Sequence, residues 1–318
     1  MATARTARGL AVACALLVAA PVGCAWRTAG ETGLCRQRTL RTRPFAASRV
    51  YAGDVEGLAY VADDDALWIS DDNARALYLV DRRSGAFRAR LREQDILAAF
   101  PDASACDDGD GDPATACSYT GALETVAYDP QSLSLYVFNT ASFPPKQPPP
   151  GKPAVYLLRK PRSGENFRFQ SWQEPPWLLG YDGVVAIDGQ LWVTTGNGLV
   201  RYDFADNRIL DLGADGKPAP ALRTSHGSVV DAAHGGGSLW LLTANAKLVQ
   251  LRWPDGVEEA VWDLAPFGIS KPKGLAVGGE EIFVVDGNPP NPIHVLRFAA
   301  APGFSRASWL GGWPSSCP

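Results

Sequence analysis

One short pattern of two apolar segments occurs five times along the 318-residue chain. An ionisable residue opens the first segment, and a polar turn separates it from a second segment that contains Trp, Tyr or Phe. The five copies begin at Glu56, Glu124, Asp182, His226 and Lys273. Further apolar segments follow, so each unit is expected to hold four short strands, which is typical of one blade of a β-propeller. The sequence therefore predicts an all-β fold, a β-propeller of four-stranded blades.

The spacing of the copies predicts the number of blades and the places of the insertions. Successive copies start 68, 58, 44 and 47 residues apart, so the last two blades are bare and the first two carry insertions, at 92–122 and 143–153. Five copies predict five blades; the alternative is a sixth blade assembled from residues 36–50 and the C-terminal tail. A propeller is a ring, so we expect closure near the N- and C-termini. The 32 Gly and 25 Pro residues suit such a turn-rich chain.

The N-terminal residues predict export. Two arginines precede an apolar run over residues 9–22, which is the form of a signal peptide, assigned to residues 1–25. Two forms of processing remain open: acylation of Cys24, giving a cell-surface lipoprotein, or ordinary cleavage after Ala25, giving a secreted protein. Residues 26–50 are then a lead-in and closing strand, and residues 51–318 the propeller domain. Contact with a membrane is expected only through the N-terminal lipid.

Four further cysteines in an exported chain predict disulfides. Cys106 and Cys117 enclose a short loop, whereas Cys35 and Cys317 stand near the two ends, so we expect the pairs Cys106–Cys117 and Cys35–Cys317. The second pair would close the ring covalently. The alternative is a set of free or differently paired thiols.

The strings VEGLAY over 55–60, LWISDD over 67–72 and LVD over 79–81 carry a family resemblance. They resemble blades of the NHL and senescence-marker-protein/gluconolactonase propellers, and of the secreted propellers named for esterase-like activity of phytase. The resemblance spans most of residues 50–310 and consists of blade-forming residues, so it implies a fold and leaves the activity open.

The first residue of each inner strand is expected at the mouth of the central channel, on the face that carries the insertions. These residues are Glu56, Glu124, Asp182, His226 and Lys273. Carboxylates with an imidazole suit a bound ligand or cation, whereas the alternative is a solvated polar ring. Ring closure should pair Lys273 with Glu56, and this ammonium would weaken cation binding.

Two metal sites follow as expectations. Gluconolactonase-type propellers hold a divalent cation with a Glu of a Glu-Gly pair, an Asp of an Asp-Gly pair and Asn side chains. The resemblance thus implies Glu56 and Asp182 as ligands in this chain. The positions that hold Asn in those propellers do not match. Separately, the alternating carboxylates of Asp108, Asp110 and Asp112 predict a weak Ca²⁺ loop or, as the alternative, a solvated acidic loop.

The function expected from these observations is binding of a small-molecule or protein ligand on the inserted face by an exported propeller. The net charge of −4 predicts no nucleic-acid partner. The alternative is a metal-dependent hydrolase, lactonase-like or esterase-like, at the channel mouth. His226 is then the candidate base, and the chain contains no Gly-x-Ser-x-Gly nucleophile motif.

Overall fold

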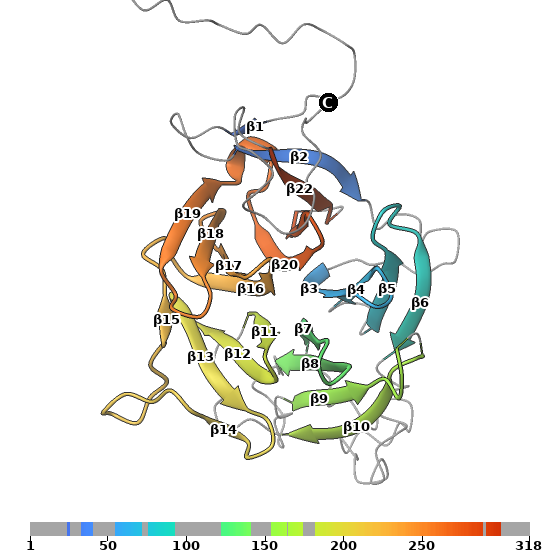
Figure 1. Ribbon diagram of the computed structural model, residues 1–318, viewed down its shortest axis with the longest axis vertical. Helices are drawn as coiled ribbons and strands as arrows, with labels where there is room; N and C mark the ends of the chain where they lie inside the picture. The colour runs from blue at the N-terminus through green and yellow to red at the C-terminus, as the bar shows by residue number, and fades with distance from the viewer. Residues whose placement is uncertain are drawn as a thin grey trace, which may run out of the picture.

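The computed structural model describes residues 24–25, 33–40, 55–71, 76–92, 122–140, 154–163, 165–173, 182–288 and 291–299. These residues form five antiparallel sheets arranged as the blades of a ring (Figure 1). The one helix among them is a single 3₁₀ turn at Ala265–Phe267. The all-β fold and the five-bladed propeller are confirmed.

Each blade runs from an inner strand beside the channel to an outer strand at the rim. The first blade holds β3 (Val55–Val61), β4 (Ala66–Asp71), β5 (Ala76–Asp81) and β6 (Phe87–Arg92). The second holds β7 (Ala122–Asp129), β8 (Ser134–Thr140), β9 (Ala154–Arg159) and β10 (Arg168–Gln173). The third holds β11 (Val184–Ile187), β12 (Gln190–Thr195), β13 (Gly198–Asp203) and the short β14 (Arg208–Ile209) and β15 (Leu222–Arg223), which both pair with β13.

The last two blades complete the ring. The fourth holds β16 (Val229–Gly235), β17 (Ser238–Thr243), β18 (Lys247–Arg252) and β19 (Glu258–Asp263). The fifth holds β20 (Pro272–Gly278), β21 (Glu281–Asp286), β22 (Ile293–Ala299), β2 (Gly33–Leu40) and the two-residue β1 (Cys24–Ala25).

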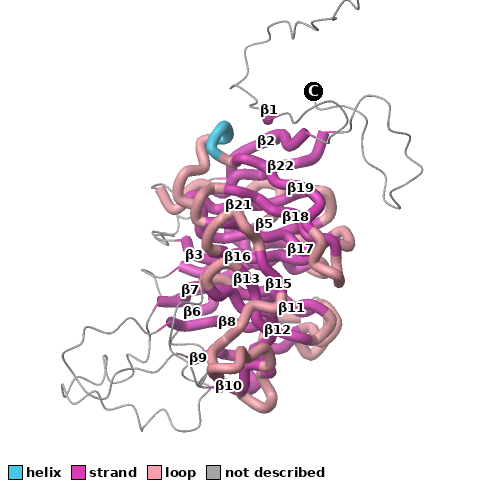
Figure 2. The backbone as a smooth tube through the Cα atoms, turned by 90° about the vertical axis from the view of Figure 1, so that its left-hand side faces the viewer, coloured by secondary structure: helices cyan, strands magenta, loops and turns pink. Residues whose placement is uncertain are grey.

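An N-terminal strand closes the ring. β2 pairs antiparallel with β22, from Gly33 opposite Ala299 to Leu40 opposite Ile293, and the two strands lie side by side in both views (Figures 1 and 2). Because an unpaired β22 would expose a row of backbone donors and acceptors, β2 supplies the missing fourth strand of the fifth blade. Residues 36–40 therefore belong to that blade, and the alternative of a sixth blade is wrong.

The core lies between blades. The aromatic residue of each second strand is buried in one of five apolar clusters, and each cluster joins two neighbouring blades; the residues are Trp68, Tyr136, Trp192, Trp240 and Phe283. β4, β17 and β21 are buried along their whole length. Burial of one such large side chain stabilises the fold by about 1.5 to 3 kcal/mol, so the repeated aromatic residue is explained by packing between blades.

Several expected features lie outside the described residues. These are the signal peptide apart from the backbone of residues 24–25, the insertions, the pair Cys106–Cys117, the aspartates 108, 110 and 112, and Cys317, the expected partner of Cys35. Within the described part of the chain, no helix is both long and apolar enough to cross a lipid bilayer.

Candidate functional site: the mouth of the central channel

The strand register identifies equivalent positions in the five inner strands. Each second-strand aromatic residue faces one small residue of the inner strand; these are Ala59, Ala127, Val185, Ala233 and Ala276. Three residues before this position stand Glu56, Glu124, Asp182, Val230 and Lys273. Four of the five predicted mouth residues are therefore equivalent, and in the fourth blade Val230 takes the place expected for His226.

His226 lies in the loop before β16. Its Nε2 atom is 3.1 Å from Oε1 of Glu258, which belongs to β19, the outermost strand of the blade. The alignment of His226 with the other four residues was wrong by four positions. The segment His226–Val229 resembles an inner-strand start in composition, but β16 begins only at Val229. The candidate base is thus directed to the rim of the blade.

The mouth residues stand at irregular positions of their strands. The pairing register shifts between Val55 and Leu58 in β3 and between Pro272 and Leu275 in β20. Such bulges re-aim side chains and are frequent beside functional sites. The direction of the Glu56 and Lys273 side chains is therefore set by these bulges as well as by the usual alternation of side chains between the two faces of a strand.

The glycine after three of the mouth residues allows the inner strands to approach closely. A β-carbon at Gly57 would lie 2.7 Å from Cα of Thr125 in the second blade, and one at Gly274 would lie 2.9 Å from the carbonyl oxygen of Glu56. Contacts under 3 Å with backbone cannot be relieved by a side-chain rotation. The Glu-Gly, Asp-Gly and Lys-Gly pairs are thus explained by packing around the ring.

An ion pair joins the fifth blade to the first at the mouth. The Lys273 ammonium binds the carboxylate of Glu56, as expected from ring closure. The Glu56 side chain is only 9% exposed, whereas that of Lys273 is 29% exposed and remains accessible from the mouth. A buried carboxylate needs such a partner, because its desolvation is otherwise costly.

Asp182 places a further carboxyl group near this pair. The residue is accessible at the mouth, yet the packing around it raises the pKa of its carboxyl group above the usual value, and the positive charge of Lys273 opposes this rise. Glu124, from the second inner strand, is half-buried, and its carbonyl oxygen accepts a hydrogen bond of 3.1 Å from the Ser70 hydroxyl. Carboxylates from three blades and one ammonium thus belong to the mouth positions.

Asp231 is a buried site residue that sequence reasoning missed. It occupies the position that Gly57 has in the first blade, and its side chain accepts hydrogen bonds from the backbone N–H of Leu275 at 2.6 Å and of Ala232 at 2.8 Å. Burial raises the pKa of its carboxyl group well above the usual value, against the effect of these donors. The signal was an Asp inside the apolar run over 229–233, which the misplaced alignment hid.

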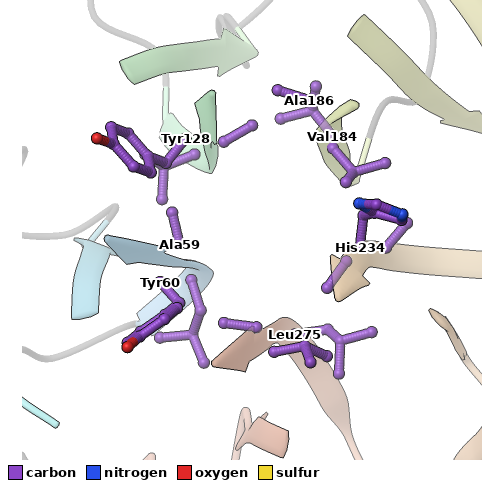
Figure 3. A pocket seen from close by; sticks show the side chains of 15 residues that line it. Ala59, Tyr60, Tyr128, Val184, Ala186, His234 and Leu275 are labelled. Atoms are coloured by element: carbon purple, nitrogen blue, oxygen red, sulfur yellow. The ribbon is translucent and has the colours of Figure 1, made fainter. Parts of the chain in front are cut away.

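Residues of the five inner strands line a cavity of about 60 Å³ in the central channel (Figure 3). The hydroxyls of Tyr60 and Tyr128 point away from its centre and donate hydrogen bonds to Asp65 at 3.0 Å and Asp63 at 2.6 Å. His234 also lines the cavity, and burial lowers the pKa of its imidazole. The other lining side chains are aliphatic, so no carboxylate, ammonium or guanidinium group lines this cavity.

The mouth residues do not fit the divalent-cation site implied by the resemblance. Among the described residues, no group of three or more His, Cys, Asp or Glu side chains is arranged to hold a metal ion. Glu56 already binds an ammonium, and the equivalent positions in the second and fourth blades hold Glu124 and Val230 where that site requires Asn. Asn197 and Asn245 instead donate to the carbonyl oxygens of Thr224, at 3.1 Å, and His226, at 3.4 Å.

Comparison with known proteins supports the fold. No family model matches the chain, and no curated protein matches it. Among solved structures, the glutaminyl cyclase of Myxococcus xanthus is 13% identical, with a TM-score of 0.52 over 84% of this chain and 97% of that chain. An aldose sugar dehydrogenase of Streptomyces coelicolor and a gluconolactonase of Xanthomonas campestris are each 12% identical with TM-scores of 0.48; they cover 84% and 87% of this chain, and 98% and 95% of their own. At such identities the likeness concerns the fold alone, and the propeller architecture implied by the resemblance to NHL and gluconolactonase-type propellers is confirmed.

Proposed function

We propose that this propeller binds a small polar ligand at the channel mouth, in contact with Glu56, Lys273 and Asp182. The observation that carries the proposal is the accessible ammonium of Lys273 on the nearly buried carboxylate of Glu56, where the first and last blades meet. An ammonium and a carboxylate together offer hydrogen-bond donors and acceptors within one small area. A ligand that carries hydroxyl or amino groups can exchange with or extend this pair.

The charge at the mouth favours one class of ligand. Three of the five mouth positions hold carboxyl groups, those of Glu56, Glu124 and Asp182, and one holds the ammonium of Lys273. This excess favours amines and polyhydroxylated compounds over anions.

The connections between strands support the same face. The β6–β7 connection leaves at Arg92 and returns at Ala122, and the β8–β9 connection leaves at Thr140 and returns at Ala154. Ala122 and Thr140 are paired residues at the mouth end of the second blade. Two long connections therefore attach beside the charged ring, and binding residues concentrate on loops of a rigid scaffold.

Calorimetric titration with a panel of monosaccharides, polyols and short amines tests the proposal. We expect one compound class to bind the wild-type protein, and Glu56→Gln to weaken that binding by about tenfold or more, as for the loss of a charged hydrogen bond. Asp255→Asn is the matched control, because this exposed carboxylate forms an ion pair with Arg252 in the β18–β19 turn. Absence of binding across the panel, or equal binding by Glu56→Gln, would contradict the proposal.

A second candidate is a metal-dependent hydrolase, lactonase-like or esterase-like. The carboxyl groups of Glu56, Glu124 and Asp182 are the oxygen ligands that such a site would use, whereas the Lys273 ammonium on Glu56 and the lack of a metal-holding group among the described residues count against it. It predicts turnover of lactones or esters that depends on an added divalent cation and is abolished in Asp182→Asn. A panel measured with Ca²⁺ and with chelator separates the two candidates, because ligand binding without metal-dependent turnover supports only the first.

A further inference from the structure

We propose that the second blade binds a phosphate or sulfate group through the guanidinium groups of Arg159 and Arg168, at the end of the blade opposite the channel mouth. Arg159 ends β9 and Arg168 begins β10, and these two strands form the rim of the blade (Figure 1). The site differs from the mouth in place and in charge, so this inference goes beyond the proposed function.

The strand register places the two arginines directly opposite one another. Ser134 of β8 is the Cα partner of Arg159, and Arg159 is in turn the partner of Arg168. Ala122 and Thr140 form the corresponding pair at the mouth end of the same blade. Like charges on directly opposite residues of an antiparallel pair destabilise a sheet. An anion that contacts both guanidinium groups would remove this repulsion.

In the described part of the chain, no carboxylate forms an ion pair with either arginine. Both residues are exposed. The acidic residue of the β9–β10 connection, Glu165, lies 4.0 Å from the guanidinium group of Arg162 instead. Two exposed guanidinium groups are therefore available to an anion from solution.

A chain of hydrogen bonds orients the Arg159 guanidinium group. Its Nε donates to the buried Ser134 hydroxyl at 3.3 Å, and Ser134 Oγ lies 2.8 Å from the hydroxyl of Ser132. The Ser132 hydroxyl donates to the carboxylate of Asp129 at 2.5 Å. The two Nη groups of Arg159 take no part in this chain and can donate to a ligand.

The neighbours of the two arginines along the chain, Lys160 and Phe167, are fixed against the first blade. Lys160 is only 2% exposed, and its ammonium binds the carboxylates of Asp63, at 3.0 Å, and Asp64. The same ammonium lies 4.9 Å from the centre of the Phe167 ring. Both ends of the β9–β10 connection are thus held in place, which reduces the entropy lost when a ligand binds.

The charge of the pair favours a tetrahedral dianion. Guanidinium groups donate paired hydrogen bonds to the oxygens of carboxylate, sulfate and phosphate groups. A phosphate ester carries a charge of about −1.5 to −2 at pH 7 and can neutralise both arginines. A carboxylate carries one charge and leaves one guanidinium group unbalanced. The shared chemistry is that of a free phosphate or sulfate ion, or of the same group carried by a larger molecule.

NMR titration at constant ionic strength tests the inference through the backbone amide signals of Arg159 and Arg168. The probes are inorganic phosphate, inorganic sulfate, glycerol 3-phosphate and acetate. We expect saturable shifts with the dianions and at least tenfold weaker binding of acetate. Arg159→Gln and Arg168→Gln should each weaken dianion binding about tenfold or more, as for the loss of a charged hydrogen bond. Arg208→Gln is the matched control, because this exposed arginine pairs with Asp206 in the third blade.

Melting temperatures measured at the same ionic strength provide a second readout. Without a dianion, Arg168→Gln should melt at a higher temperature than the wild-type protein, because the substitution removes the repulsion between opposite arginines. Saturating phosphate should raise the melting temperature of the wild-type protein and leave that of Arg168→Gln unchanged.

Saturation by the inorganic ions would show that a free dianion is sufficient, and saturation by glycerol 3-phosphate alone would show that the group is recognised as part of a larger molecule. Either result supports the inference. It is overturned if no probe gives a saturable shift, if acetate binds as tightly as the dianions, or if both arginine variants retain wild-type affinity. Such a failure leaves the proposal for the mouth standing, because Arg159 and Arg168 lie at the other end of the blade.

Discussion

The seam between the first and fifth blades carries an ion cluster at each end of the channel, and the two clusters differ in exposure. At the mouth, Lys273 binds Glu56. At the opposite end, the carboxylate of Glu281 binds Arg82 at 2.5 Å and Arg297 at 3.1 Å. Arg82 also binds Asp65, at 2.6 Å. Both clusters join β-strands from the start and the end of the chain.

The difference between the ends separates a structural contact from a candidate functional one. At the opposite end Arg82 and Arg297 meet the carboxylate of Glu281, whose side chain is 1% exposed, and Arg82 and Arg83 meet that of Asp65. At the mouth the ammonium of Lys273 is accessible, and three of the five mouth positions hold carboxyl groups. A buried ion cluster stabilises the seam, whereas an accessible one can bind something else.

The largest expected effect is at the end that holds the buried Glu281 carboxylate. Glu281→Ala leaves the guanidinium groups of Arg82 and Arg297 without their shared carboxylate, and breaking a buried pair in this way costs about 3 to 5 kcal/mol of unfolding free energy. Urea denaturation measures this loss. Asp255→Ala, in an exposed ion pair, should leave the denaturation midpoint unchanged. Equal effects of the two substitutions would mean that the buried cluster does not hold the seam.

An intermediate effect is expected from packing at the mouth. Gly57→Ala places a β-carbon 2.7 Å from Cα of Thr125 and 2.9 Å from the Glu124 carbonyl oxygen, so the first two inner strands must separate. Overpacking of this kind costs about 1 to 3 kcal/mol of unfolding free energy. Gly213→Ala is the control, since its nearest neighbour is the carboxylate of Asp215 at 3.1 Å, on a side chain that can move. If both variants unfold at the same urea concentration, the close approach of the strands is not required.

The smallest effect is a difference in the pH dependence of stability at the two ends. Burial raises the pKa of the Asp182 carboxyl group above 3.8. The contribution of this group to the unfolding free energy is therefore complete below pH 3.8 and is lost as the pH rises through its pKa in the folded protein. The hydrogen bond from Arg82 lowers the pKa of Asp65, so its contribution is present above pH 3.8 and is lost as the pH falls through the folded value.

Two asparagine variants test these opposite signs. Asp182→Asn should reduce the loss of stability with rising pH, and Asp65→Asn should reduce the loss with falling pH. Urea midpoints compared between about pH 3 and pH 6, the range in which carboxyl groups titrate, measure both changes. If both substitutions change the pH dependence of the urea midpoint in the same direction, the opposite effects expected of Asp182 and Asp65 are wrong.

Local pattern was sufficient to predict the architecture. Each blade repeats an apolar segment with an aromatic residue such as Trp68 or Trp240, because each needs the same large side chain against its neighbour. Such a requirement leaves a signal within a few residues, so five repeats predicted five blades. The pairing of Lys273 with Glu56 followed from the closure of a ring whose ends had to meet.

Only the tertiary structure decided which residues stand at the mouth and how the ring closes. The position of Val230 and Asp231 depends on a bulge in β16 and on its register with β17, and these are set by long-range pairing that a short segment does not encode. For the same reason His226, with a composition suited to a strand start, is paired with Glu258 at the rim. Likewise, β2 is separated from β22 by most of the chain, and only the unpaired edge of the fifth blade determines its place.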